Sequence, residues 1–179
     1  KEDMFSAYVK EKKDCIYFGT FRKHRIDDMK RFNGAKYLIS SSKKNHLKYQ
    51  KAGIEAQFIN RLGWHKDREE LFAFKYSIYF EDIHTHDNYA YMANRYYECV
   101  MCDVLMFFDA KCMNTVNKSN YIIDPFLIVE DGEELNKKMD ELNNDVEKYN
   151  FIFNKQKSNI RAILREKKEV IQQIKNSLL

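Results

Sequence analysis

The sequence lacks the features that mark membrane and secreted proteins. No apolar run approaches the roughly 18 residues that a membrane-spanning helix needs, and residues 1–4 (KEDM) do not resemble a secretory signal. The cysteines are too sparse for a disulfide-stapled scaffold, so we expect reduced thiols. These absences predict a cytoplasmic protein that does not contact a membrane.

Common nucleotide-binding and hydrolytic motifs are also missing from the 179 residues. The chain has no G-x-x-x-x-G-K-[ST] and no three-glycine dinucleotide fingerprint, which argues against an ATPase or a dehydrogenase. It has no G-x-S-x-G elbow, so covalent hydrolysis has no support. No D-x-D occurs, which removes the usual sign of a sugar diphosphate clamped by a metal ion.

Two local clusters could bind a metal, but each has a simpler interpretation. Cys99 and Cys102 form a C-x-x-C inside an apolar helical segment without a second ligand pair, which favours core packing over zinc or redox chemistry. His84 and His86, with aspartates nearby, could hold a divalent ion, although a polar loop explains them more simply. We therefore assign no metal site.

Charge is distributed unevenly along the chain, whose net charge is +4. Basic residues crowd the first third, at Lys10, Lys12, Lys13, Arg22, Lys23, Arg25, Lys30, Arg31, Lys36, Lys43, Lys44, Lys48 and Lys51. Such a region could follow nucleic-acid phosphates, neutralise the phosphates of a smaller ligand, or serve only solubility. Charge by itself does not decide among these roles.

Short apolar segments alternate with helical ones. Strands are expected at 15–18, 37–40, 54–59, 77–80, 104–108 and 126–129, and helices at 27–32, 43–52, 67–74 and 89–102. This alternation predicts an α/β fold with a Rossmann-like parallel sheet flanked by helices. Ligands of such sheets lie beyond the carboxyl ends of the strands, so the loops at 19–25, 61–63 and 81–95 should converge.

The chain divides into three parts. We expect a lead-in at 1–14, a nucleotide-sugar-binding α/β domain at 15–131, and long helices at 132–179 that carry an apolar stripe. Those helices could reach across to another domain or pack on the same sheet.

Arg95 and Glu98 lie three residues apart in the segment before the apolar run 104–108. At that spacing they share one helix face, so a guanidinium could hold phosphate while a carboxylate accepts hydrogen bonds from two ribose hydroxyls. The alternative is a surface ion pair worth about 0.3 kcal/mol.

With the segments Tyr17–Arg25, Asn94–Cys99 and Val104–Asp109 in view, the chain resembles the phage DNA β-glucosyltransferases, which are of the GT-B type. The resemblance is to their carboxyl-terminal, donor-binding half, and it covers most of the chain from about Cys15.

The resemblance implies roles for particular residues. The arginine loop contains Gly19, Thr20, Arg22, Lys23 and Arg25. By resemblance, Arg22, Arg25 and Arg95 bind the diphosphate, with Arg22 and Arg95 stabilising the leaving group, and Glu98 binds ribose. The loop is one residue shorter here than in the family, so Lys23 could replace Arg25. Uracil would be read by backbone groups near Arg61 and Leu62.

The reaction implied by the resemblance is transfer of glucose from UDP-glucose to a hydroxyl on hydroxymethylated or glucosylated bacteriophage DNA, with inversion, in the infected host cell. The general base and the DNA-reading surface would belong to an absent amino-terminal domain, and a role for a divalent metal is left open. Two alternatives remain: a non-catalytic nucleotide- or nucleic-acid-binding module, and a GT-B sugar transferase with a non-DNA acceptor.

Overall fold

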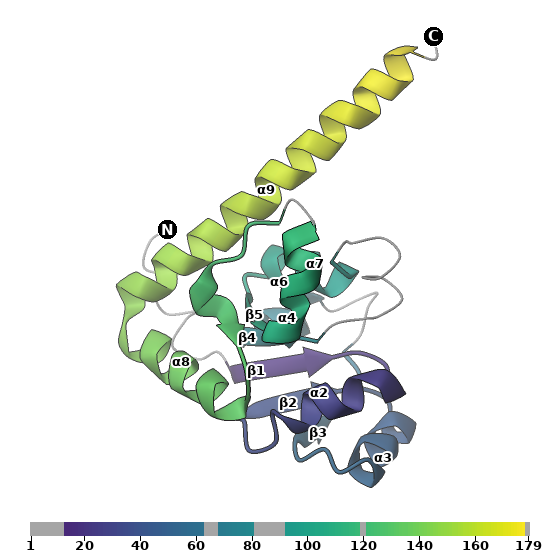
Figure 1. Ribbon diagram of the computed structural model, residues 1–179, viewed down its shortest axis with the longest axis vertical. Coiled ribbons are helices and arrows are strands. Elements are labelled where there is room, and N and C mark those ends of the chain that lie inside the picture. Colours follow the sequence, from purple (N-terminus) through teal and green to yellow (C-terminus); the bar gives the residue numbers. More distant parts are fainter. Residues whose placement is uncertain (1–12, 63–67, 81–91, 119–120, 178–179) are drawn as a thin grey trace.

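The computed structural model describes residues 13–62, 68–80, 92–118 and 121–177, and its centre is a parallel sheet (Figure 1). The strands are β1 (Lys13–Phe18), β2 (Tyr37–Ser40), β3 (Gln57–Ile59), β4 (Phe74–Tyr79), β5 (Leu105–Asp109) and β6 (Ile128–Val129). All neighbouring pairs are parallel, in the order β3-β2-β1-β4-β5-β6. The predicted α/β class and parallel sheet are confirmed.

The helices connect the strands and extend beyond them. They are α2 (Ile26–Lys30), α3 (Lys43–Lys51), α4 (Arg68–Phe72), α6 (Asn94–Met101), α7 (Met113–Lys118), α8 (Gly132–Asn144) and α9 (Val146–Ser177). Short 3-10 turns accompany them in the described parts of the chain: η1 (Lys23–Arg25), η2 (Ala110–Cys112) and η3 (Pro125–Leu127). No described helix is both long and apolar enough to cross a membrane.

The two central strands explain why their sequences are nearly continuous apolar runs. Every residue of β4 and β5 is buried, since helices cover both faces of the sheet. Polar side chains in these strands bond backbone or side-chain groups: Ser77 Oγ donates to the Ile16 carbonyl oxygen at 2.8 Å, and Lys75 Nζ donates to Asn143 Oδ1 at 2.7 Å. The core is rich in aromatic rings, among which Tyr76 contacts both Phe107 and Tyr149.

The order in which successive strands are added to the sheet reverses between β1 and β4, although the strands themselves stay parallel. From β1 the chain steps outward to β2 and β3, and from β4 it steps outward the other way to β5 and β6. The carboxyl ends of β1 and β4 therefore flank a topological switch point, where parallel α/β sheets bind their ligands.

The carboxyl-terminal helices begin on this domain and then leave it. Asp131 caps α8 by accepting from the Glu134 N–H at 2.9 Å, and the break between α8 and α9 falls at Asp145. Within α9, Gln156 is buried and bonds both the N–H and the carbonyl oxygen of Met106 at 3.0 Å. These contacts fix the first half of α9 against β5.

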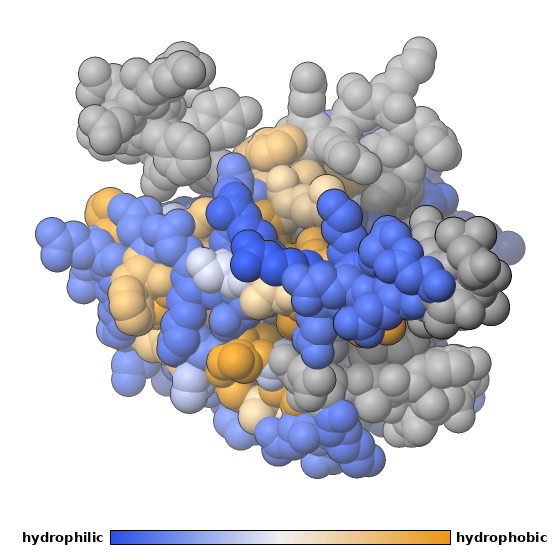
Figure 2. Space-filling view, turned by 90° about the horizontal axis from the view of Figure 1, so that it is seen from above, coloured by the Kyte–Doolittle hydropathy of each residue, from blue (hydrophilic) through white to orange (hydrophobic). Residues whose placement is uncertain are grey.

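Beyond Ile160, the second half of α9 projects away from the sheet toward the carboxyl terminus (Figure 1). Leu164, Val170 and Ile171 are exposed there by 44%, 48% and 54%. Figure 2 looks from that end and shows hydrophobic patches among hydrophilic side chains. The predicted apolar stripe therefore exists, but its distal part does not pack on this sheet.

Several predicted boundaries were wrong. Residues 126–127 were expected in a strand, but Pro125 has no N–H and fixes φ, and Asp124 accepts from the Phe126 N–H at 3.0 Å, which makes a 3-10 turn. The helix expected to reach Phe74 ends at Phe72, because Phe74 already pairs with Lys13 in the sheet. Helix α7 was not predicted.

Candidate functional site

The strongest candidate site lies at the switch point, where the turn after β1 meets the beginning of α6. The Gly19 N–H donates to the Ser40 carbonyl oxygen at 3.3 Å, and Ser41 Oγ donates to the Gly19 carbonyl oxygen at 2.8 Å. These bonds attach the turn to the carboxyl end of β2. A Cβ atom at Gly19 would lie 3.2 Å from the Tyr17 hydroxyl and 3.5 Å from Arg95 Nη2. Only glycine leaves the space beside the Tyr17 hydroxyl and Arg95 Nη2 open.

Arg25 reaches this point from the η1 turn. Its side chain is buried, with 2% of the residue exposed, and Nη1 donates to the Tyr17 hydroxyl at 3.0 Å. A guanidinium is rarely buried so completely without a specific role, since its desolvation is costly. The turn that follows β1 thus directs the Arg25 side chain into the fold, whereas Arg22 and Lys23 stay exposed.

Arg95 enters from the first turn of α6, whose preceding residue is fixed by a tyrosine. The Ala93 N–H donates to the Tyr79 hydroxyl at 2.9 Å. The Arg95 guanidinium carbon lies 5.2 Å from the centre of the Tyr17 ring and 5.5 Å from that of Tyr79, both within cation–π range. Although Arg95 as a whole is only partly buried, its Nη1 atom is inaccessible and has no hydrogen-bond partner among the described residues.

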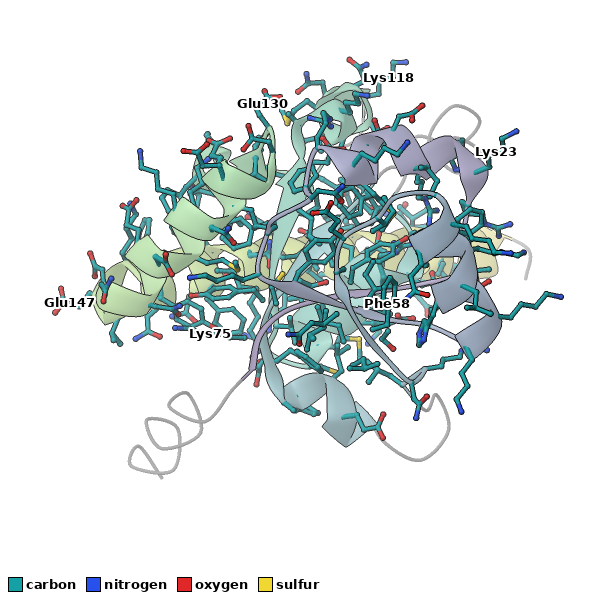
Figure 3. The ribbon with its side chains drawn as sticks, turned by 90° about the horizontal axis from the view of Figure 1, so that it is seen from below. Lys23, Phe58, Lys75, Lys118, Glu130 and Glu147 are labelled. Atoms are coloured by element: carbon teal, nitrogen blue, oxygen red, sulfur yellow. The ribbon has the colours of Figure 1, made fainter. Side chains whose placement is uncertain are left out.

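The other predicted residues surround this centre. Thr20, Arg22 and Lys23 lie in the turn after β1 and are exposed. Figure 3 shows Lys23 pointing outward from the fold. Glu98 is half-buried one helical turn beyond Arg95.

In the loop after β3, Arg61 is exposed and the Leu62 N–H donates to Ser40 Oγ at 3.0 Å. That bond ties this loop to the end of β2 as well. The structure thus brings Gly19, Arg25 and Arg95 into one cluster and places the remaining candidates in the segments that continue from it.

Tyrosines complete the cluster, and sequence reasoning missed them. Tyr17, Tyr49 and Tyr79 are fully buried, and the Tyr49 hydroxyl has no well-formed hydrogen bond among the described residues. Burial raises the pKa of both Tyr49 and Tyr79 well above the usual range. The sequence does place tyrosines near the arginine-rich turn. Because they lie within apolar runs, however, their pattern predicts core residues and not site residues.

The candidate metal and thiol sites gain nothing from the structure. Cys99 and Cys102 are buried, and burial raises the pKa of the Cys99 thiol, which suits core packing. Across the described ranges, no group of three or more His, Cys, Asp or Glu side chains could hold a metal ion. The cluster around His84 and His86 lies outside the described residues.

The chemistry of the central cluster suits an anion. Two guanidiniums from separate elements meet beside a glycine, and one of them has a buried N–H group without a partner among the described residues. Guanidinium groups bind phosphate and carboxylate oxygens through paired N–H donors. They cannot ligate a metal cation, because they present donors only.

Comparison with solved structures places this arrangement in a known fold. No protein-family model and no curated protein sequence matches the chain. A mutant of T4 phage β-glucosyltransferase in complex with UDP-glucose matches with a TM-score of 0.71 at 19% identity, over 90% of this chain and 47% of that one.

Two further structures give the same result. The DNA-modifying enzyme β-glucosyltransferase, solved with and without uridine diphosphoglucose, matches with a TM-score of 0.71 at 19% identity, over 91% of this chain and 50% of that one. The T4 phage enzyme in complex with UDP and Mn²⁺ matches with a TM-score of 0.70 at 18% identity, over 93% and 48%.

The present chain spans about half the length of the enzymes that it matches. At this level of identity the likeness concerns the fold. The six-stranded parallel sheet with its flanking helices and long carboxyl-terminal helix therefore has the architecture of one half of a GT-B glycosyltransferase, and the structural match is to T4 phage β-glucosyltransferase.

Proposed function

We propose that this chain is the donor-binding half of a nucleotide-sugar glycosyltransferase, and that the donor is UDP-glucose. The observation that carries the proposal is the meeting of Arg25 and Arg95 beside Gly19, with the buried Arg95 Nη1 left without a described partner. A diphosphate offers the oxygens that such donors lack. The likeness in fold to an enzyme solved with UDP-glucose supports this choice of ligand.

In this proposal the diphosphate lies against Gly19 and the Arg25 and Arg95 guanidiniums. Arg22 and Lys23, which are exposed in the same turn, approach it from the solvent side together with Thr20. Basic groups thereby surround a ligand that carries concentrated negative charge.

The nucleoside would extend from that point. Glu98, one turn beyond Arg95 on α6, accepts hydrogen bonds from the ribose hydroxyls, since a carboxylate has acceptor sites for two donors. The loop with Arg61 and Leu62 supplies backbone groups to uracil. The Leu62 N–H is already bonded to Ser40 Oγ, so uracil would displace that bond or use carbonyl oxygens.

The transfer step would be a direct displacement at the anomeric carbon of glucose. The bond from the acceptor oxygen to that carbon forms as the bond to the diphosphate oxygen breaks, which inverts the configuration. Negative charge grows on the leaving diphosphate, where fixed guanidiniums stabilise it. Loss of one such pre-placed donor costs about 2.7–4 kcal/mol of barrier in comparable oxyanion sites.

The general base and the acceptor would come from a complementary half, either elsewhere in the same polypeptide or in a separate one. We propose that this half covers the distal part of α9, where Leu164, Val170 and Ile171 are exposed. A helix segment that projects into water gains little stability by itself, and an apolar stripe needs a covering surface. Under this assignment residues 15–131 form the donor domain and residues 132–179 connect the two halves.

The proposed acceptor is a hydroxyl on hydroxymethylated or already glucosylated phage DNA, since the matched enzyme is described as DNA-modifying. The basic residues of α3, which include Lys43, Lys44 and Lys48 and are exposed, lie in the part of the chain that a polyanion would approach. In this proposal their positive charge contacts the phosphates of the acceptor DNA.

Calorimetric titration of the chain with UDP-glucose, UDP and uridine tests donor binding. We expect UDP to bind at least about tenfold more tightly than uridine, because charge-assisted hydrogen bonds contribute about 1.5–3 kcal/mol each. Replacing Arg22 with Ala should weaken UDP more than uridine. Equal affinities for UDP and uridine would contradict the proposed diphosphate site.

A transfer assay tests the reaction once a complementary half is supplied. Mass spectrometry should then detect glucose on hydroxymethylated DNA and none on unmodified DNA. Turnover without DNA would indicate a protein or small-molecule acceptor. Donor binding without any product would favour a non-catalytic nucleotide-binding module.

A further inference from the structure

Tyr17 occupies an unusual position in the candidate site. It is fully buried at the end of β1, two residues before Gly19. Arg25 donates to its hydroxyl at 3.0 Å, and the Arg95 guanidinium lies against its ring at 5.2 Å and close to the same hydroxyl. One phenol oxygen is therefore shared by two guanidiniums that arrive from different elements.

We propose that Tyr17 is a positioning residue for the diphosphate: its phenol oxygen accepts from Arg25 and holds Arg95 beside it before the ligand binds, and where that oxygen is ionised it takes up a proton when the ligand reaches the same guanidiniums. This inference rests on the proposed donor site, and adds to it a residue that the diphosphate need not touch. Tyr17 would act through the two arginines, whose direction and spacing its hydroxyl sets.

Among the buried tyrosines of this cluster, Tyr17 is the one whose hydroxyl the neighbouring charges favour in its ionised form. The groups that face Tyr17 are Arg25 from η1, Arg95 from α6, Tyr49 from α3, Tyr37 from β2 and Tyr79 near Arg95 on β4. Burial opposes ionisation of Tyr17, but the Arg95 and Arg25 guanidiniums outweigh it, so its pKa falls to about 8. Burial raises the pKa of Tyr37, Tyr49 and Tyr79 instead.

The position of Gly19 couples this phenol to the ligand. A carbon atom at the Gly19 Cβ position would lie within 3.5 Å of both the Tyr17 hydroxyl and Arg95 Nη2. A diphosphate oxygen that approaches Gly19 therefore meets the same guanidinium that stabilises the phenolate. Two anions would then share one pair of cations, and repulsion between them raises the pKa of Tyr17 in the complex.

The sign of the pH dependence follows from this shift. Below about pH 8 the phenol is already protonated, so binding needs no proton. Above it the phenolate must take a proton from solvent when the ligand binds, so affinity falls as pH rises. The limiting slope is about tenfold per pH unit, with close to one proton taken up per ligand.

Calorimetry with UDP-glucose in buffers of different ionisation enthalpy tests the proposal. We expect wild-type protein to take up close to one proton per ligand one pH unit above the pKa of Tyr17, and clearly less one unit below it. In Tyr17→Phe both the uptake and the slope should disappear. Tyr149→Phe is the matched control, since Tyr149 is also buried but packs on Phe153 and beneath Lys75, and it should behave as wild type.

The outcomes separate this inference from the proposed function. Titration of the ligand itself is common to all three proteins and cancels in the comparison. Binding with an unchanged slope in Tyr17→Phe, or with no slope in wild type, overturns the role of Tyr17 alone. Absence of UDP-glucose binding by wild type at every pH overturns the donor site.

A second measurement on wild type does not depend on a variant that folds. Addition of UDP-glucose above the pKa of Tyr17 should reduce the ultraviolet absorbance of tyrosinate by close to one group. An unchanged tyrosinate signal at saturating ligand would also overturn the proposal.

Discussion

Replacing Arg95 with Met should separate binding from stability. The substitution keeps a long side chain but removes the cation and its donors. It loses two cation–π contacts, with Tyr17 and Tyr79, worth about 0.5–1 kcal/mol each, and a hydrogen bond to the Tyr17 hydroxyl worth about 0.5–1.5 kcal/mol. It also removes a buried N–H group without a described partner, whose desolvation costs about 1–3 kcal/mol. The two effects nearly cancel, so stability should change little.

Binding should change much more. If Arg95 makes two charge-assisted hydrogen bonds to the diphosphate, their loss costs about 3 kcal/mol or more, which is a loss of more than about 100-fold in UDP affinity. Thermal unfolding should shift by no more than about 2–4 °C, the change that about 1 kcal/mol produces in a chain of this length.

The assay is calorimetric titration with UDP beside thermal unfolding of the same samples. Arg165→Met is the matched control, because Arg165 is exposed on the distal part of α9. A variant that retains wild-type UDP affinity, or that loses affinity only because it unfolds, would refute the assignment of Arg95 as a diphosphate ligand.

Three further predictions concern neighbouring positions. Glu98→Gln should weaken UDP and uridine by the same factor in calorimetry, since the ribose is common to both; a change in their ratio would exclude a ribose contact. Gly19→Ala should weaken UDP by up to about tenfold with little change in melting temperature, because its Cβ would lie 3.2 Å from the Tyr17 hydroxyl; unaltered binding would show that nothing approaches Gly19. Gln156→Leu leaves the Met106 N–H and carbonyl oxygen without their partner, so it should lower the melting temperature by at least about 4 °C. Gln172→Leu, on the exposed part of α9, should leave the melting temperature unchanged. Equal melting temperatures of the two variants would contradict the structural role of Gln156.

The strands of this fold were predictable because buried parallel strands leave a simple signature. The segments at 37–40 and 104–108 are short apolar runs bounded by polar residues, and the structure places β2 and β5 there within one residue. Gly53, with φ of +79°, follows the C-cap of α3, where glycine commonly ends a helix. At these positions the local amino-acid composition was enough to predict the secondary structure.

Other elements depend on contacts that sequence does not display. Helix α7 is short and mixes polar residues with Met113 and Val116, so its helical form follows from packing, as the burial of Thr115 and Val116 shows. Residues 126–127 are apolar enough for a strand, yet the capping bond of Asp124 and the fixed φ of Pro125 decide their form.

The candidate site was predictable in its arginines but not in its tyrosines. Arg25 stands out because it follows an expected strand, and Arg95 because it lies one helical turn before Glu98 in an expected helix; the fold brings the two arginines together. Tyr17 has no such signal, since a tyrosine inside Cys15–Phe18 is a normal strand residue. Its importance comes from two guanidiniums that are 8 and 78 positions away in sequence, and only the folded chain shows that they meet.

A crystal structure of this chain with UDP would test the central claim most directly. We expect the diphosphate oxygens within hydrogen-bonding distance of the Arg25 or Arg95 guanidinium beside Gly19, and the ribose hydroxyls on Glu98. UDP bound at another place on the molecule, with the Arg95 Nη1 atom still lacking a partner, would contradict the proposed donor site.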